Sequence, residues 1–97
     1  MNILKNKVIL ITGGQGFLAF EFSKFLLKNN ATVITIDIKK NKNFINLKKK
    51  FKNNYFYFES NICNENELIF LTKILKKKFK KIDVLINNAA NNPTVEK

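Results

Sequence analysis

The sequence lacks histidine and tryptophan altogether, and it holds a single cysteine and a single proline. Without histidine there is no Ser-His-Asp triad and no imidazole for a metal, so we expect no metal site. Because Cys63 is the only cysteine, the chain cannot form an internal disulfide. A chain without disulfides is typical of a reducing compartment, so we expect a cytoplasmic protein. No uninterrupted run of aliphatic or aromatic residues is longer than four, which excludes a membrane span and a secretory signal.

Acidic residues are also scarce. The chain has 18 basic residues, all of them lysine, against 7 acidic ones, for a net charge of +11. Such an excess of positive charge is compatible with nucleic-acid binding. Arginine, however, which binds phosphates and base edges better than lysine does, is absent. The lysine runs at 48–50 and 76–78 stand near expected helix ends, where cations suit the helix dipole. We expect a solvated lysine face and neither nucleic acid nor membrane as partner, with a polyanion patch as the alternative.

The 97 residues, 45% of them hydrophobic, suffice for one modest core. Four short runs of apolar and β-branched residues predict buried strands, at 7–12, 32–37, 55–59 and 82–87. Three stretches between them predict helices, at 17–30, weakly within 39–54, and at 64–81. Strands that alternate with helices predict an α/β fold with a doubly wound parallel sheet, in the order 3-2-1-4.

Two of the expected helices have a readable apolar face. The spacing in 17–30 predicts burial of Leu18, Phe22, Phe25 and Leu26. The opposite face would then carry Glu21, Ser23, Lys24 and Lys28. At the start of the last helix, Asn64 and Glu67 have the spacing of a capping box. This helix is expected to be buried through Leu68, Leu71, Ile74, Leu75 and Phe79.

Residues 14–19 fit the pattern G-x-G-x-x-G/A between a strand and a helix. Early glycines permit a tight turn, Gly16 lets a pyrophosphate approach the backbone, and Ala19 lets helix and strand pack closely. The amides at the helix start would face the phosphates. Asp37 ends the second strand, 21 residues after Gly16, where a carboxylate accepts from ribose hydroxyls. Together they predict a dinucleotide site; the alternatives are turn-forming glycines and a strand-end or capping aspartate.

The carboxylate of Asp37 also bears on the choice of dinucleotide. It would repel a 2′-phosphate, and Ile38 rather than a cation follows it, so the sequence favours NAD over NADP. The nearby Lys39 and Lys40 leave NADP as the less favoured alternative.

Four motifs follow one another along the chain, and their order and spacing are more specific than any one of them: Thr12 to Ala19, Asp37-Ile38, Asn61-Ile62 and Asn87 to Ala90. With them the chain resembles the short-chain dehydrogenase/reductase family over essentially its whole length. The resemblance implies a Rossmann-type sheet, truncated after about four strands, and an NAD-dependent oxidoreductase. The cofactor contacts that it implies come from the turn (Gly13, Gly14, Gln15, Gly16, Phe17, Leu18), the ribose site (Asp37, Ile38), the adenine site (Asn61, Ile62) and the end of the fourth strand (Asn88, Ala89, Ala90).

Departures from the family pattern concern both binding and catalysis. Asn61 stands where an aspartate is usual, and Ala90 where a glycine is usual. The family's serine and Tyr-x-x-x-Lys have no counterpart, so we expect no catalytic residue in this chain. We expect residues 1–97 to be a single partial domain of a longer enzyme, aggregation-prone or oligomeric alone, with the small-molecule substrate bound only in the full-length parent.

Two alternatives remain for the function. The run Gly-Gly-x-Gly-Phe-Leu also resembles nucleotide-sugar epimerases and dehydratases of the extended branch, although Asn87-Asn88 favours the ordinary dehydrogenases. A non-catalytic NAD-binding module is the alternative outside enzymes.

Overall fold

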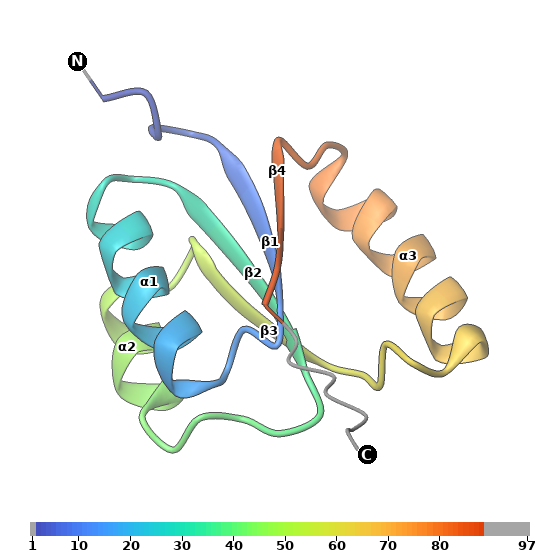
Figure 1. Ribbon diagram of the computed structural model, residues 1–97. Coiled ribbons are helices and arrows are strands. Elements are labelled where there is room, and N and C mark those ends of the chain that lie inside the picture. Colours follow the sequence, from blue (N-terminus) through green and yellow to red (C-terminus); the bar gives the residue numbers. More distant parts are fainter. Residues whose placement is uncertain (1, 89–97) are drawn as a thin grey trace.

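The computed structural model describes residues 2–88, which form one parallel four-stranded sheet with helices on both faces (Figure 1). The strands are β1 (Val8–Thr12), β2 (Thr32–Asp37), β3 (Tyr55–Glu59) and β4 (Val84–Asn87). The helices are α1 (Phe17–Lys28), α2 (Phe44–Lys50) and α3 (Glu65–Phe79). The strand order β3-β2-β1-β4 confirms the predicted topology, and every predicted strand is present.

Two apolar layers hold the sheet between the helices. Helices α1 and α2 cover one face and α3 covers the other (Figure 1). The layer beneath α1 and α2 is formed by Ile9, Ile11, Ala19, Phe20, Leu26, Leu27, Ala31, Val33, Phe44, Leu47 and Tyr55. The smaller layer beneath α3 has Ile34, Ile36, Leu71 and Leu75 at its centre. Side chains that alternate along β2 therefore enter both layers, which explains why that strand reads as continuously apolar.

Helix α1 packs through a different face from the one that its spacing suggested. The buried residues are Ala19, Phe20, Ser23, Leu26 and Leu27. The prediction was right for Leu26 but wrong for Leu18, Phe22 and Phe25, which are exposed, and for Ser23, which is fully buried. Two apolar stripes overlap on this helix, and the small side chains of Ala19 and Ser23 select the face that approaches the sheet most closely.

Helix α3 begins with a modified cap. The side chain of Asn64 accepts a hydrogen bond from Glu67 N, as expected. The Glu67 carboxylate does not return to Asn64; it accepts from Asn61 N at 3.0 Å and from Ser60 Oγ at 3.4 Å. The cap therefore fixes the loop between β3 and α3. Leu68, predicted to be buried, is 41% exposed, and it lines a hollow between α3 and β4 together with Leu85 and Asn87.

Lysines cover the outer edge of β3. Lys48 Nζ donates to the carbonyl oxygens of Lys52 and Tyr55, and it lies 4.3 Å from the centroid of the Phe56 ring. Burial lowers the pKa of Lys48, and the neighbouring ammonium of Lys78 lowers it further. An edge strand whose carbonyl is occupied by a charged side chain resists pairing with another strand.

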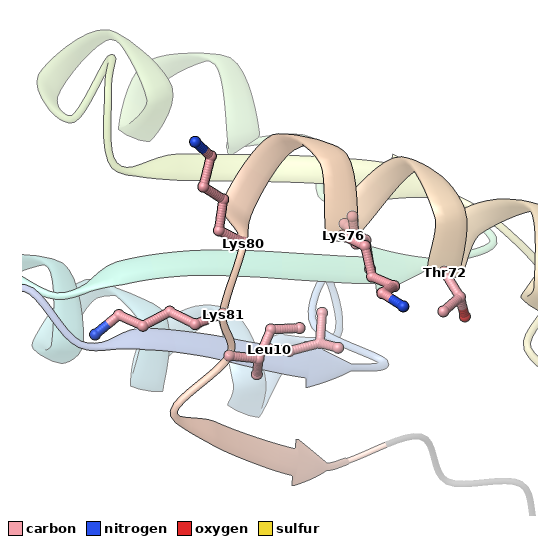
Figure 2. A pocket seen from close by; sticks show the side chains of 7 residues that line it. Leu10, Thr72, Lys76, Lys80 and Lys81 are labelled. Carbon is pink, nitrogen blue, oxygen red and sulfur yellow. The ribbon is translucent and has the colours of Figure 1, made fainter.

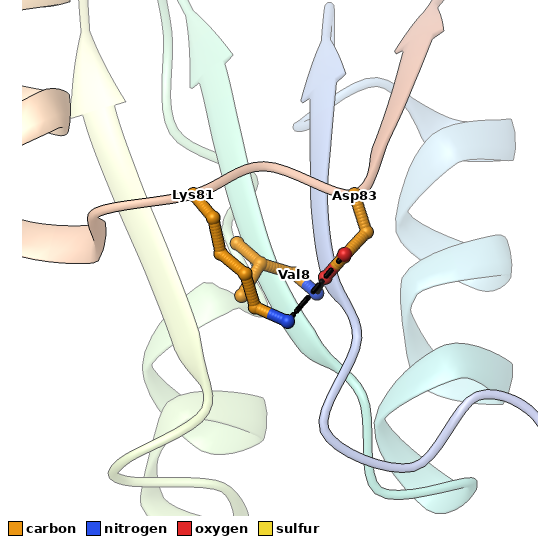
Figure 3. Close-up of polar contacts among 3 residues, drawn as sticks. All are labelled: Val8, Lys81 and Asp83. Carbon is orange, nitrogen blue, oxygen red and sulfur yellow. Dashed lines mark hydrogen bonds and ion pairs between the residues drawn. The ribbon is translucent and has the colours of Figure 1, made fainter.

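Strand β4 is joined to β1 at its start by Asp83. The carboxylate accepts from Val8 N at 2.8 Å, and Asp83 N donates to Val8 O at 2.8 Å (Figure 3). Lys81 Nζ lies 3.4 Å from the same carboxylate oxygen. The hydrogen bond from Val8 is the main cause that lowers the pKa of Asp83, and Lys81 adds to it. Further along β4, Leu85 is 64% exposed.

Candidate functional site

The glycine-rich turn after β1 is built on two glycines with different structural roles. Gly13 has φ 65°, in the left-handed region that favours glycine. A Cβ at Gly14 would lie 2.6 Å from the side chain of Thr35 and 2.8 Å from the carbonyl oxygen of Ile11. The turn therefore lies directly against β2. A Cβ at Gly16, in contrast, would meet only Gly13 O at 3.4 Å, so space remains beside this residue.

Most amides of the turn itself are used within the protein. Gly13 N and Gly14 N both donate to Ile36 O, and Gly16 N donates to Gly13 O. These bonds fix the turn to the end of β2 and leave those N–H groups unavailable to a ligand.

The amides without a partner lie one step later, in the first turn of α1. Gly16 is the N-cap and has no side chain to cap the helix, and Phe20 N is the first helical amide to bond, to Gly16 O. Within residues 2–88, the N–H groups of Phe17, Leu18 and Ala19 have no protein acceptor. Such unpaired amides at the positive end of a helix dipole are suited to receive an anion, and the predicted contact with phosphates at this helix start stays a prediction.

Asp37 stands at the end of β2, beside this helix start. Its Oδ2 accepts from Gln15 N at 3.0 Å and its Oδ1 accepts from Ile38 N at 2.8 Å. A carboxylate has about four acceptor sites, so each oxygen keeps one for another donor. The half-buried side chain is thus held in place with acceptor capacity left on the pocket side.

Gln15 points away from this space, into the interior. Its Nε2 donates to Thr35 Oγ1 at 2.9 Å and to Tyr55 Oη at 3.2 Å, and its Oε1 accepts from Asn41 N at 2.7 Å. Burial raises the pKa of Tyr55 to about 12, against a smaller lowering effect of the Gln15 hydrogen bond. Gln15 thereby links the turn to β2, β3 and the loop that follows β2.

A pocket of about 570 Å³ opens at the carboxyl ends of the strands. Its lining is Gly13, Gly16, Phe17, Leu18, Ile36, Asp37, Ile38, Ser60, Asn61, Ile62, Cys63 and Asn88. It brings together most of the predicted site residues, but Gly14 and Gln15 support the turn from behind. Ala89 and Ala90 lie outside the described residues.

Three lining residues were not anticipated from the sequence: Ile36, Ser60 and Cys63. The latter two flank the predicted pair Asn61-Ile62, and that adjacency was the available signal. Three apolar side chains at the pocket are strongly exposed: Phe17 by 79%, Leu18 by 72% and Ile38 by 66%. Exposed apolar groups gathered at a concave site are typical of a ligand-binding surface.

The end of β4 braces the turn from the other side. Thr12 Oγ1 donates to Asn87 Oδ1 at 2.8 Å, Asn88 N donates to Thr12 O at 3.1 Å, and Asn88 Nδ2 donates to Gly13 O at 3.3 Å. The pocket therefore lies where the chain order of the strands reverses, between β1 and β4. Open α/β sheets bind ligands at such switch points.

Other parts of the described chain offer less chemistry. A hollow of about 360 Å³ beneath α3 is lined by Leu10 and by lysine side chains, among them Lys76, Lys80 and Lys81 (Figure 2). Its lining has no acidic side chain, and its polar side chains are the hydroxyl of Thr72 and the amines of the three lysines. Residues 2–88 contain no group of three His, Cys, Asp or Glu side chains placed to hold a metal ion. None of the helices described in this range has the length and apolar character needed to cross a bilayer.

Comparison with known proteins agrees with this geometry. A family model described as short chain dehydrogenase matches residues 7–97. An uncharacterised oxidoreductase of Saccharomyces cerevisiae is 35% identical over 85 residues, which cover 88% of this chain and 27% of the yeast protein. The 3-hydroxyacyl-CoA dehydrogenase type-2 of Rattus norvegicus is 30% identical over 86 residues, 89% of this chain and 33% of the rat protein.

Solved structures show the same relationship. The crystal structure of a dehydrogenase aligns over 99% of this chain and 37% of its own, with a TM-score of 0.86 and 26% identity. An NADH-dependent reductase complexed with NAD aligns over 87% of this chain and 36% of its own, with a TM-score of 0.74 and 28% identity. The chain thus spans between 27% and 37% of the lengths of these four proteins. It belongs to the short-chain dehydrogenase family.

Proposed function

We propose that the pocket at the carboxyl ends of the strands binds NAD, and that this region supplies the cofactor-binding part of an oxidoreductase that works in the cytoplasm. The observation that carries the proposal is that the unpaired amides of α1 and the carboxylate of Asp37 line one pocket. A dinucleotide needs both: donors for its phosphates and an acceptor for its ribose. Its family membership and the NAD complex of the similar reductase support the same ligand.

The phosphates fit the start of α1. Gly16 has no side chain, and the space beside it is open. The N–H groups of Phe17 and Leu18 are available there at the positive end of the helix dipole. The protein thus offers preorganised main-chain donors to a diphosphate without a charged side chain.

Asp37 favours NAD over NADP. Its remaining acceptor sites suit the two hydroxyls of an adenosine ribose, whereas a 2′-phosphate would place negative charge against the carboxylate. The two lysines that follow do not offset this repulsion at the pocket, because neither Lys39 nor Lys40 lines it. Lys40 Nζ instead lies 5.5 Å from the centroid of the Phe44 ring.

The chain's own contribution to a reaction is binding and orientation. Bound NAD would supply a hydride acceptor. The side chains of Ile38 and Ile62 offer apolar contact to a base, while Asn88 fixes the turn by its bond to Gly13 O. These 97 residues contain no Tyr-x-x-x-Lys pair, so the proposal assigns them no proton transfer and no substrate.

Titration of the full chain with NAD and with NADP by calorimetry tests the proposal. We expect NAD to bind more tightly than NADP. Asp37→Asn should weaken NAD binding about tenfold, the scale of a lost hydrogen bond to a charged group, and reduce the preference over NADP. Glu59→Gln is the matched control, because Glu59 ends β3 directly opposite Asp37 but does not line the pocket. Equal losses in both variants, or no binding of either dinucleotide, would contradict the proposal.

A further inference from the structure

Asn61 is held in one orientation at the wall of the pocket. Its backbone N–H donates to Glu67 Oε1 at 3.0 Å, and its Oδ1 accepts from Cys63 N at 3.0 Å. A backbone N–H can only donate, so the side-chain atom that meets Cys63 N must be the carbonyl oxygen. The other end of the amide is therefore the NH₂ group, and its position is fixed by two contacts within the loop.

The NH₂ group of Asn61 is the part that remains available. Asn61 lines the pocket and is exposed, and within residues 2–88 its Nδ2 has no acceptor. The nearest acid along the chain, Glu67, does not line the pocket, and its Oε1 accepts from Asn61 N and Ser60 Oγ. Where Asn61 lines the pocket, the wall thus presents a hydrogen-bond donor, and the Glu67 carboxylate, which holds the Asn61 backbone, is not part of the lining.

The position of Asn61 corresponds to the base of a bound dinucleotide. A nucleotide runs in the order phosphate, ribose, base, and the first two are assigned above to α1 and Asp37. Ser60 N donates to Asp37 O at 3.0 Å, which places Asn61 one residue beyond the ribose position. Ile38 and Ile62, which neighbour Asp37 and Asn61 in the sequence, also line the pocket and suit the faces of a purine. This assignment rests on the proposed function.

We infer that the base subsite accepts a 6-oxo purine as readily as a 6-amino purine, and that Asn61 is the residue that permits it. A donor at this position bonds a ring nitrogen of adenine or the 6-oxygen of hypoxanthine. A carboxylate there would accept from the 6-amino group and repel the 6-oxygen. The ligand class is therefore a dinucleotide with either purine, and NAD and nicotinamide hypoxanthine dinucleotide should bind with similar affinity.

The test is calorimetric titration of the full chain with these two dinucleotides. We expect the two dissociation constants of the wild-type chain to agree within about threefold, less than the tenfold that one hydrogen bond to a charged group supplies. Asn61→Asp keeps an acceptor for Cys63 N and replaces the donor with a carboxylate. It should shift the ratio about tenfold toward NAD. Asn64→Asp is the matched control, since it makes the same substitution at the α3 cap, outside the pocket, and should leave the ratio unchanged.

The outcomes separate this inference from the proposed function. If NAD binds but the wild-type chain prefers it about tenfold or more, the inference is wrong while the proposed function stands. An unchanged ratio in Asn61→Asp, or an equal shift in Asn64→Asp, also overturns it. If neither dinucleotide binds, the proposed function fails and the inference fails with it.

Discussion

The backbone N–H of Gln15 donates a 3.0 Å hydrogen bond to Oδ2 of Asp37, so the glycine-rich turn directly holds the acid that ends β2. The side chain of the same residue is buried against Thr35 and Tyr55. One residue therefore connects the glycine-rich turn, Asp37 and the core. A carboxylate that is fixed before a ligand arrives loses less conformational freedom on binding.

Replacement of Gln15 tests whether this link stabilises the fold. Gln15→Met has a similar length but forms none of the side-chain hydrogen bonds, and it leaves Asn41 N and buried hydroxyls with fewer partners. We expect the free energy of unfolding to fall by about 2–4 kcal/mol, measured by urea denaturation. Asn46→Met, on the exposed part of α2, should change it by less than about 0.5 kcal/mol. Similar values for the two variants would show that the buried network contributes nothing.

The two glycines of the motif should respond differently to alanine. Gly14→Ala places a methyl group 2.6 Å from Thr35 and should destabilise the fold by about 1–3 kcal/mol. Gly16→Ala meets only Gly13 O at 3.4 Å, so the fold should tolerate it within about 1 kcal/mol. The new methyl group would instead occupy the space of the diphosphate and weaken NAD binding about tenfold or more. Thermal melts and NAD titrations of both variants check this, and normal NAD affinity in Gly16→Ala would contradict it.

The lowered pKa of Asp83 predicts that the attachment of the edge strand β4 to β1 weakens in acid. Its pKa is lowered in the folded state, so it contributes stability above the ordinary value of 3.8 and loses that contribution as the pH falls through the folded value. Asp83→Asn should be less stable than the wild type at pH 7, and the two should converge as the pH falls through the lowered pKa of Asp83 and its carboxyl group becomes neutral. Urea denaturation over pH 2.5–7 measures the difference. A constant gap between the two curves would exclude a charge-dependent contact with Val8.

Replacement of Ser23 by alanine is expected to stabilise the protein. Its hydroxyl is fully buried in α1, and within residues 2–88 it has no hydrogen-bond partner. Ser23→Ala removes this unsatisfied group and favours the helix, so unfolding should cost about 1 kcal/mol more. Ser60→Ala is the contrast, because the buried Ser60 Oγ donates to Glu67 and its loss should destabilise by a similar amount. If both substitutions changed the free energy of unfolding in the same direction, the conclusion that Ser23 is unsatisfied and Ser60 is hydrogen-bonded would be wrong.

Much of the architecture follows from local sequence patterns. The β-branched runs end at Thr12, Asp37 and Asn87, and the strands end at those same residues. The face of α1 was misjudged, because hydrophobic spacing alone does not show that Ala19 and Ser23 permit the closest approach to the sheet. That selection depends on the volume available beneath the helix, which is a tertiary property.

The candidate site was predictable in outline and not in its hydrogen bonds. The glycine motif and Asp37 have a fixed spacing with a physical reason, and the pocket contains both. Gln15 meets Tyr55 across 40 residues, and no local pattern predicts such a partner. Glu67 has the spacing of a capping-box partner for Asn64, but its carboxylate accepts from Asn61 N instead, which the spacing alone does not predict.

The most direct test of the account is a two-dimensional ¹H–¹⁵N NMR titration of the full chain with NAD. The central claim is that unpaired amides at the start of α1 receive the phosphates. It predicts that the largest shifts occur at the N–H groups of Phe17, Leu18 and Ala19, while those of Gly13 and Gly14, already bonded to Ile36 O, move less. Absence of shifts in the first turn of α1, or shifts centred on the hollow beneath α3, would contradict it.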